Sequence, residues 1–336
     1  MKQRDTALDI IRILACFMVV LMHSPMPSVN ANGPFVAALN YFTMPCIGLF
    51  FMVSGALLLP VKMDYTAFLK RRLQKVVFPT LFWTLVYIGL NLLNDTASWQ
   101  ESVKYLISIP FSAQGHGVLW FMYTLVGLYL LAPIISAWLE KARKKDLQLV
   151  LGLWAVSICY PLLEPVVDIN ESISGTLYYF GGYAGYFLLG FYLKRFPKSI
   201  SLVAASAIAA AGAIIIFSFK RLGIEIDFYR MFGYLSIFIV SMTAGLWIIV
   251  NYSCKYLRNI ALQMWGQLSN LSFGVYLMHI LVMRYWLWKL VWLKSISCYE
   301  LQTIITAVIT IAVSFTLCFL ISKTAVGDYI IGYKEK

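Results

Sequence analysis

Long apolar runs separated by short polar stretches dominate this chain. Most runs approach the roughly 20 residues that a membrane-spanning helix needs, and aromatic residues crowd many run ends, as they do at membrane interfaces. The runs predict helices at 6–25, 39–59, 74–94, 118–139, 147–163, 176–193, 200–219, 232–251, 268–290 and 302–321. The pattern therefore predicts an all-α fold, a polytopic membrane helix bundle with about ten transmembrane helices.

The composition supports lipid as the solvent for much of the chain. Of the 336 residues, 61% are hydrophobic and 12% are charged, whereas a soluble domain has roughly 45–50% apolar and about 25% charged residues. No repeat or composition shift marks a second domain, so residues 1–336 are expected to form a single transmembrane domain. The six cysteines contain no C-x-x-C pair, and no metal site is indicated.

The net charge of +12 follows from membrane topology rather than from a nucleic-acid partner. Lys and Arg collect on the cytoplasmic side of membrane proteins. If the N-terminus is cytoplasmic, most of the 27 basic residues fall in inside segments, notably 62–75 and 141–145. An even number of spans then returns the C-terminus to the cytoplasm. This bias predicts a multi-pass protein surrounded by membrane lipid, with both termini inside and no nucleic acid bound.

Three ionisable residues lie in the first predicted span, where such groups usually face a protein interior or a wet cavity. Arg12 and His23 are 11 residues apart, close to three helical turns, so they share one face about 16 Å apart along the axis. Asp9 lies within ion-pairing reach of Arg12. The alternative is that Asp9 and Arg12 sit at headgroup depth while His23 only caps the helix.

A basic run of Lys70, Arg71, Arg72 and Lys75 leads into the third span. It could be a simple topology anchor. It could also bind the phosphates of a cytoplasmic donor molecule, because the planar guanidinium of Arg forms bidentate bonds with phosphate.

Two further groups are candidates for a pocket lining. Ser272, Tyr276 and His279 are spaced four and three residues apart, which places them along one helix face. His116 and Trp120 open the fourth span and are expected near the depth of His23. A buried histidine that only satisfies a neighbour, or an interfacial tryptophan anchor, would give the same patterns.

Taken together, these motifs resemble the acyltransferase 3 family of membrane acyltransferases. The stretch from Leu8 with Arg12 and, ten intervening residues later, His23 is similar to the first helix of that family. The basic run resembles its R-x-x-R element, with Lys75 in place of the second Arg. The runs beginning at Leu119 and Tyr276 also look like family features. The compact bacterial O-acetyltransferases of surface polysaccharides, such as enterobacterial common antigen, are the most similar in style.

The resemblance implies an O-acyltransferase in the bacterial cytoplasmic membrane. It would move an acyl group, by default acetyl from acetyl-CoA, to a hydroxyl of a surface glycan or lipid-linked oligosaccharide. His23 is then the general base, while Arg12 lines the path of the acyl-pantetheine arm or helps to hold CoA, with Asp9 setting its orientation. Arg71, Arg72 and Lys75 hold CoA, and His116, Trp120, Ser272, Tyr276 and His279 line the substrate pocket.

Two rivals from other classes stay open at this stage. A polysaccharide or lipid exporter would have the same number of spans but would need neither a buried histidine nor a CoA cluster. A membrane assembly subunit would tolerate alanine at His23 and Arg12. The sequence also leaves open the acyl group, direct transfer against an acyl-histidine relay, and whether the chain forms a homo-oligomer.

Overall fold

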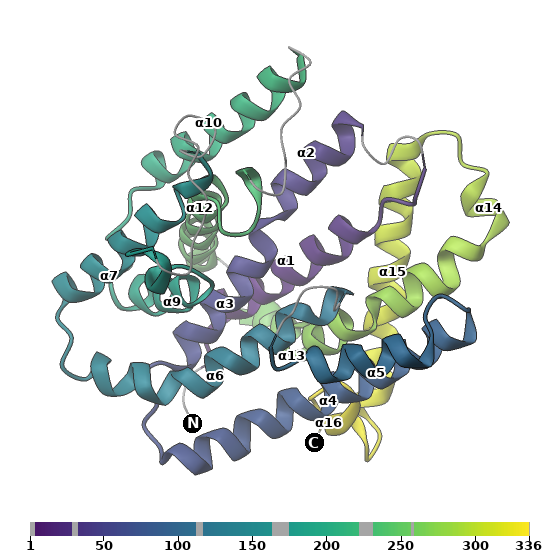
Figure 1. Ribbon diagram of the computed structural model, residues 1–336, viewed down its shortest axis with the longest axis horizontal. Helices are drawn as coiled ribbons and strands as arrows, with labels where there is room; N and C mark the ends of the chain where they lie inside the picture. The colour runs from purple at the N-terminus through teal and green to yellow at the C-terminus, as the bar shows by residue number, and fades with distance from the viewer. Residues whose placement is uncertain are drawn as a thin grey trace. The chain divides into compact units, whose positions relative to one another are not determined.

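The computed structural model describes residues 4–28, 33–111, 117–162, 175–221, 231–256 and 259–335. Within these ranges the chain forms helices joined by loops, with no strand (Figure 1). The structure therefore confirms the all-α class.

The helices of the described residues follow one another along the chain. Their bounds are α1 Thr6–His23, α2 Pro34–Thr43, α3 Pro45–Leu58, α4 Tyr65–Leu93, α5 Trp99–Ser108, α6 Trp120–Leu139, α7 Lys144–Ser157, α9 Ala184–Arg195, α10 Leu202–Arg221, α12 Ile237–Ser253, α13 Asn259–Ile280, α14 Val291–Lys294, α15 Tyr299–Ser322 and α16 Gly327–Ile330. Short 3₁₀ segments are η2 Gly117–Leu119, η3 Tyr178–Phe180, η4 Cys254–Tyr256 and η6 Leu287–Lys289, and η5 Leu281–Trp286 is a π-helix.

Each of the ten predicted spans overlaps a helix, although the span 176–193 meets α9 only from Ala184 and the end of the span 147–163 lies outside the described residues. Five stretches of the described residues are long and apolar enough to cross a membrane on their own: Thr6–His23, Pro34–Leu58, Tyr65–Leu93, Gly117–Leu139 and Tyr299–Ser322. Leu202–Ser218 and Ile237–Ser253 are shorter apolar helices. The α7 and α9 helices have only 14 and 12 residues, less than the about 20 residues of a full span. A membrane helix bundle is thus confirmed, and the length criterion is met at five of the predicted positions.

The chain divides into two compact units, each assembled from two separate stretches. The first unit comprises Met1–Leu59 and Ala137–Gly266, and the second comprises Pro60–Ser136 and Gln267–Lys336. Neither unit is a contiguous piece of sequence. The single-domain organisation stays a prediction.

Two helix boundaries differ from the hydrophobic pattern for local reasons. The predicted span 39–59 is split into α2 and α3 at Met44, directly before Pro45, because proline cannot donate a helical hydrogen bond. The α4 helix begins at Tyr65 rather than 74. Its N-cap Asp64 accepts hydrogen bonds from the amides of Thr66 and Ala67 at 3.1 and 3.2 Å. The basic run is therefore part of the helix.

In the first unit, α3 packs against α1, α9 and α12. Two glycines let α3 and α9 approach closely. A Cβ on Gly55 would lie 1.8 Å from the carbonyl oxygen of Phe187, and one on Gly190 would lie 2.0 Å from that of Met52. Small residues at membrane helix interfaces permit such backbone contact. Among the glycine positions of this unit, the closest approach is therefore the one between α3 and α9.

In the second unit, the C-terminal segment packs beside α4. The α16 helix contacts α4 (Figure 1), and the indole nitrogen of Trp83 donates to the carbonyl of Ile330 at 2.9 Å. Lys323 and Glu335 form an ion pair at 2.8 Å. A Cβ on Gly274 would lie 2.9 Å from the Sγ of Cys318, so α13 and α15 are also in close contact. These contacts hold α4, α13, α15 and α16 together.

The backbone contact between α3 and α9 predicts a large stability difference between two small substitutions. Gly190→Ala should lower the thermal unfolding midpoint, because overpacking a well-packed contact costs about 1–3 kcal/mol. The matched control is Gly152→Ala in α7, where a Cβ meets nothing within 4 Å. That variant should be neutral or slightly stabilising, since alanine is the better helix former by about 0.8–1 kcal/mol. Size-exclusion profiles of heated, detergent-solubilised protein measure both; equal midpoints would contradict the close approach.

Candidate functional site

The N-terminal half of α1 is held by a buried carboxylate. Asp9 accepts hydrogen bonds from Nε and Nη2 of Arg4 at 2.5 and 3.0 Å, and Nη2 also donates to the carbonyl of Gly266 at 2.7 Å. The spacing in the sequence indicated Arg12 as a partner of Asp9, whereas the structure shows Arg4 bonded to it. Arg4 therefore connects α1 to α13, and the effect of Asp9 on the orientation of Arg12 stays a prediction.

Arg12 and His23 lie on α1 as the helical spacing predicts, and both side chains are half-buried. The α1 helix ends at His23, where the hydroxyl of Ser24 donates to the carbonyl of Val20 at 2.7 Å and Pro25 follows. The Nδ1 of His23 lies 2.8 Å from the carbonyl oxygen of Val19. A carbonyl only accepts, so the neutral ring carries its proton on Nδ1, and Nε2 is the basic nitrogen.

The basic run lies on the first half of α4, in the second unit. Arg71 and Lys75 are exposed and four residues apart, while Arg72 is half-buried. The C-terminal segment runs against this part of α4. Gly332 adopts a φ of +67°, and a Cβ there would lie 2.8 Å from the carbonyl oxygen of Lys75. Three cations are thus presented by one helix beside an ordered C-terminal segment.

The predicted group on α13 lies in the packed interior of the second unit. Ser272 and His279 are fully buried, and Tyr276 is 2% exposed. The Tyr276 hydroxyl donates to the carbonyl of Val118, and Nδ1 of His279 lies 2.6 Å from the carbonyl of Tyr276. The Tyr276 bond connects α13 to η2, and the His279 bond lies within α13. They give Tyr276 and His279 a clear structural role, and their predicted role in a substrate pocket is not tested.

The remaining two predicted pocket residues precede or open α6. Trp120 is half-buried, with its ring centroid 6.4 Å from that of Phe121. His116 lies outside the described residues.

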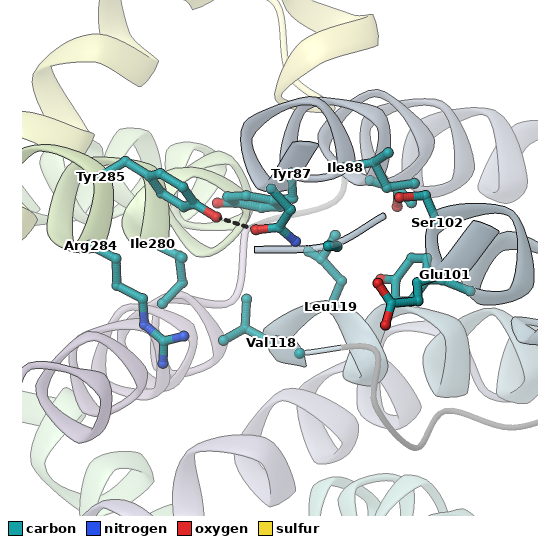
Figure 2. A pocket seen from close by; sticks show the side chains of 14 residues that line it. Tyr87, Ile88, Glu101, Ser102, Val118, Leu119, Ile280, Arg284 and Tyr285 are labelled. Atoms are coloured by element: carbon teal, nitrogen blue, oxygen red, sulfur yellow. Dashed lines mark hydrogen bonds between the residues drawn. The ribbon is translucent and has the colours of Figure 1, made fainter. Parts of the chain in front are cut away.

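A cavity of about 400 Å³ lies within the second unit. None of the predicted pocket residues that the structure describes lines it, although some of their neighbours in the sequence do. Figure 2 shows Arg284 and Tyr285 on one side and Glu101 and Ser102 on the other. The lining comes from α4, the α4–α5 loop, α5, η2 and the end of α13 with η5: Thr84, Tyr87, Ile88, Asn91, Ala97, Glu101, Ser102, Tyr105, Gly117, Val118, Leu119, Ile280, Arg284 and Tyr285.

Hydrogen bonds fix the aromatic wall of this cavity. The hydroxyl of Tyr285 donates to Oδ1 of Asn91 at 2.6 Å, and that of Tyr87 donates to the carbonyl of Leu277 at 2.6 Å. The two tyrosine rings stack with centroids 6.5 Å apart. The wall is therefore pre-organised across α4, α13 and η5.

Sequence reasoning missed this cavity and its two charged residues, Arg284 and Glu101. One signal was present, since Arg284 falls inside the predicted span 268–290, where an arginine is unusual. Glu101 had no comparable signal, because a Ser-x-x-Glu pattern also marks an ordinary helix start. Among the described residues, no group of three or more His, Cys, Asp and Glu side chains could hold a metal ion.

Comparison with known proteins assigns the chain to a family. Residues 5–323 match the profile described as an acyltransferase domain, that of the acyltransferase 3 family. An amino-acid racemase of Enterococcus faecalis is 27% identical over 144 residues, which cover 41% of this chain and 20% of that protein. The matched part is thus a fifth of the racemase, and the racemase activity is a property of that larger protein. No solved structure matches. Because the acyltransferase profile spans nearly the whole chain, this protein belongs to the acyltransferase 3 family of membrane acyltransferases.

Proposed function

We propose that this membrane acyltransferase moves an acyl group, acetyl by default, from cytoplasmic acyl-CoA to a hydroxyl of a cell-envelope glycan or lipid-linked sugar. The observation that carries the proposal is the hydrogen bond between Nδ1 of His23 and the carbonyl of Val19. With the proton of the neutral ring on Nδ1, Nε2 carries the basic lone pair of a half-buried histidine, in a chain that belongs to a family of acyltransferases.

The chemistry needs one proton acceptor. A sugar hydroxyl is a poor nucleophile, so Nε2 of His23 removes its proton as the oxygen attacks the thioester carbonyl carbon. The new C–O bond forms, the C–S bond breaks, and the proton passes from Nε2 to the departing CoA sulfur. The products are an O-acyl ester and CoA. An acyl group carried briefly by Nε2 would use the same atom.

The donor is assigned to the basic stretch of α4. CoA carries several phosphates, and the guanidinium groups of Arg71 and Arg72 suit bidentate phosphate contacts, with Lys75 adding a point charge. Arg12 on α1 would line the path of the acyl-pantetheine arm. The α4 location supports this assignment, because a helix presents all three cations within about one turn.

The membrane orientation is part of the proposal, since the donor is cytoplasmic. The Lys and Arg distribution predicts cytoplasmic termini and an outward-facing first connection. Reporter fusions should score outside after residue 30 and inside after residue 145. The reverse pattern would remove the basic stretch from the cytoplasm and overturn the donor assignment.

Replacing the proposed base should abolish acylation without lowering the amount of protein in the membrane. His23→Gln keeps polarity and much of the volume but cannot accept a proton, so glycan acylation should fall about 10²–10⁴-fold. Mass spectrometry of surface glycans from cells with and without each variant measures acylation, and immunoblots of membranes measure protein level. His279→Gln is the companion variant. Near-normal acylation by His23→Gln would make His23 structural and move the assignment to His279.

Removing one donor-binding cation should weaken acyl-CoA binding. Arg72→Gln should raise the dissociation constant of acetyl-CoA by about tenfold, since charge-assisted hydrogen bonds are among the stronger ones. Added salt should weaken binding to the unmodified protein as well, because part of the attraction is between exposed charges. Lys62→Gln is the control, a loss of the same charge at an exposed position before α4. Equal binding by both variants would indicate that the basic stretch of α4 only sets the membrane topology.

A further inference from the structure

The cavity of the second unit has the size and the wall of a ligand site (Figure 2). Its volume of about 400 Å³ falls within the about 300–1,000 Å³ of small-molecule pockets. Its aromatic wall is held by the Tyr285–Asn91 and Tyr87–Leu277 hydrogen bonds. A wall fixed in this way loses little freedom when a ligand binds.

A cation stands on one side of this cavity. Arg284 belongs to the π-helix η5, whose i→i+5 bonding lets residues five apart face the same side, so that Ile280, Arg284 and Tyr285 all line the cavity. No carboxylate of the described residues forms an ion pair with Arg284. Its guanidinium lies 5.5 Å from the ring of Trp288. The guanidinium edge thus remains suited to a bidentate bond with an anion.

An anion stands on the other side. Glu101 closes a capping box at the start of α5, where Oε2 accepts from the amide and the hydroxyl of Ser98 at 2.7 and 2.9 Å. These bonds hold the pKa of Glu101 below its usual range. An ionised carboxylate only accepts hydrogen bonds, so it suits ligand hydroxyls and disfavours a second anion nearby.

The remaining lining suits a ring with hydroxyl groups. Tyr87, Tyr105 and Tyr285 offer aromatic faces, against which the C–H faces of a sugar ring can pack. Asn91 and Ser102 add donors and acceptors between them. The arrangement is therefore polar at two opposed sides, with aromatic and aliphatic side chains making up most of the remaining lining.

We propose that this cavity binds a sugar ring bearing an anionic substituent, a carboxylate or a phosphate. Arg284 binds the anion, and Glu101 and Asn91 accept hydrogen bonds from ring hydroxyls. This inference rests on the proposed function, because it identifies the acceptor as an anionic glycan unit. The carboxylate would belong to a uronic acid residue, and the phosphate to a sugar phosphate such as the headgroup of a lipid carrier.

Three simple probes test the charge requirement. Saturation-transfer NMR on the full-length protein in nanodiscs compares glucuronic acid, glucose 1-phosphate and glucose. One or both anionic probes should bind at least about tenfold more tightly than glucose. Preference for glucuronic acid identifies a uronic acid acceptor, and preference for glucose 1-phosphate identifies a sugar phosphate. Equal binding of all three, or binding of none, overturns the proposal.

Substitutions test whether Arg284 causes the preference for the anionic probes. Arg284→Gln should weaken the preferred anionic probe about 10- to 100-fold, the range expected for losing a charge-assisted hydrogen bond, with little effect on glucose. Arg284→Lys should retain part of the preference and shows that the position tolerates change. Lys294→Gln removes the same charge from an exposed position of α14 outside the cavity lining, and should bind as the unmodified protein does. Equal effects of Arg284→Gln and Lys294→Gln would overturn the assignment.

The binding assay also separates this inference from the proposed function. It contains no acyl-CoA, and His23→Gln should bind the anionic probe normally. If His23→Gln abolishes glycan acylation while Arg284→Gln leaves probe binding unchanged, the acceptor assignment fails alone. If Arg284 governs probe binding while His23→Gln keeps full acylation, the site exists and the proposed catalytic role of His23 fails.

Discussion

The structure depends on the need to satisfy polar groups without water. In the hydrocarbon core each unpaired amide or carbonyl costs several kcal/mol, and helices satisfy these groups within one segment. Side-chain hydroxyls follow the same rule by bonding to a carbonyl one turn earlier. Thr84, Thr243 and Thr306 do so at 2.6–2.7 Å. Most buried polar side chains therefore form a hydrogen bond within their own helix, and those that bond to other segments are the exceptions.

Those exceptional groups include the residues on which the proposed chemistry of this membrane acyltransferase rests. Asp9 is compensated by two bonds from Arg4, which makes its burial tolerable. Tyr276 and Tyr285 use their hydroxyls to join separate helical segments. Nδ1 of His23 bonds to the carbonyl of Val19 in its own helix, and the guanidinium of Arg284 lies against the ring of Trp288. The first two arrangements stabilise the fold, and the last two belong to the residues that we propose as the base and as the anion-binding group.

The fold was largely predictable because hydrophobic runs report burial in lipid directly. Helix ends were less so, since they depend on single residues such as Asp64 and Pro45 that the averaged hydropathy ignores. The register of Arg12 and His23 was predictable because both lie on one continuous helix. The cavity was not, because its lining comes from separate segments, and the π-helical turn that brings Arg284 and Tyr285 to one side leaves no periodic signal.

The hydrogen bond to Nδ1 of His23 also fixes the orientation of the imidazole ring. The ring is anchored to the carbonyl of Val19, so it does not need to turn over between gaining a proton and releasing it. In the reaction proposed above, one edge of the imidazole would serve both the incoming oxygen and the departing sulfur. The two proposed substrates, a charged nucleotide thioester and a carbohydrate, differ greatly in size and would have to meet at this single atom. An inhibitor that places a small polar group at this edge would exclude both substrates at once.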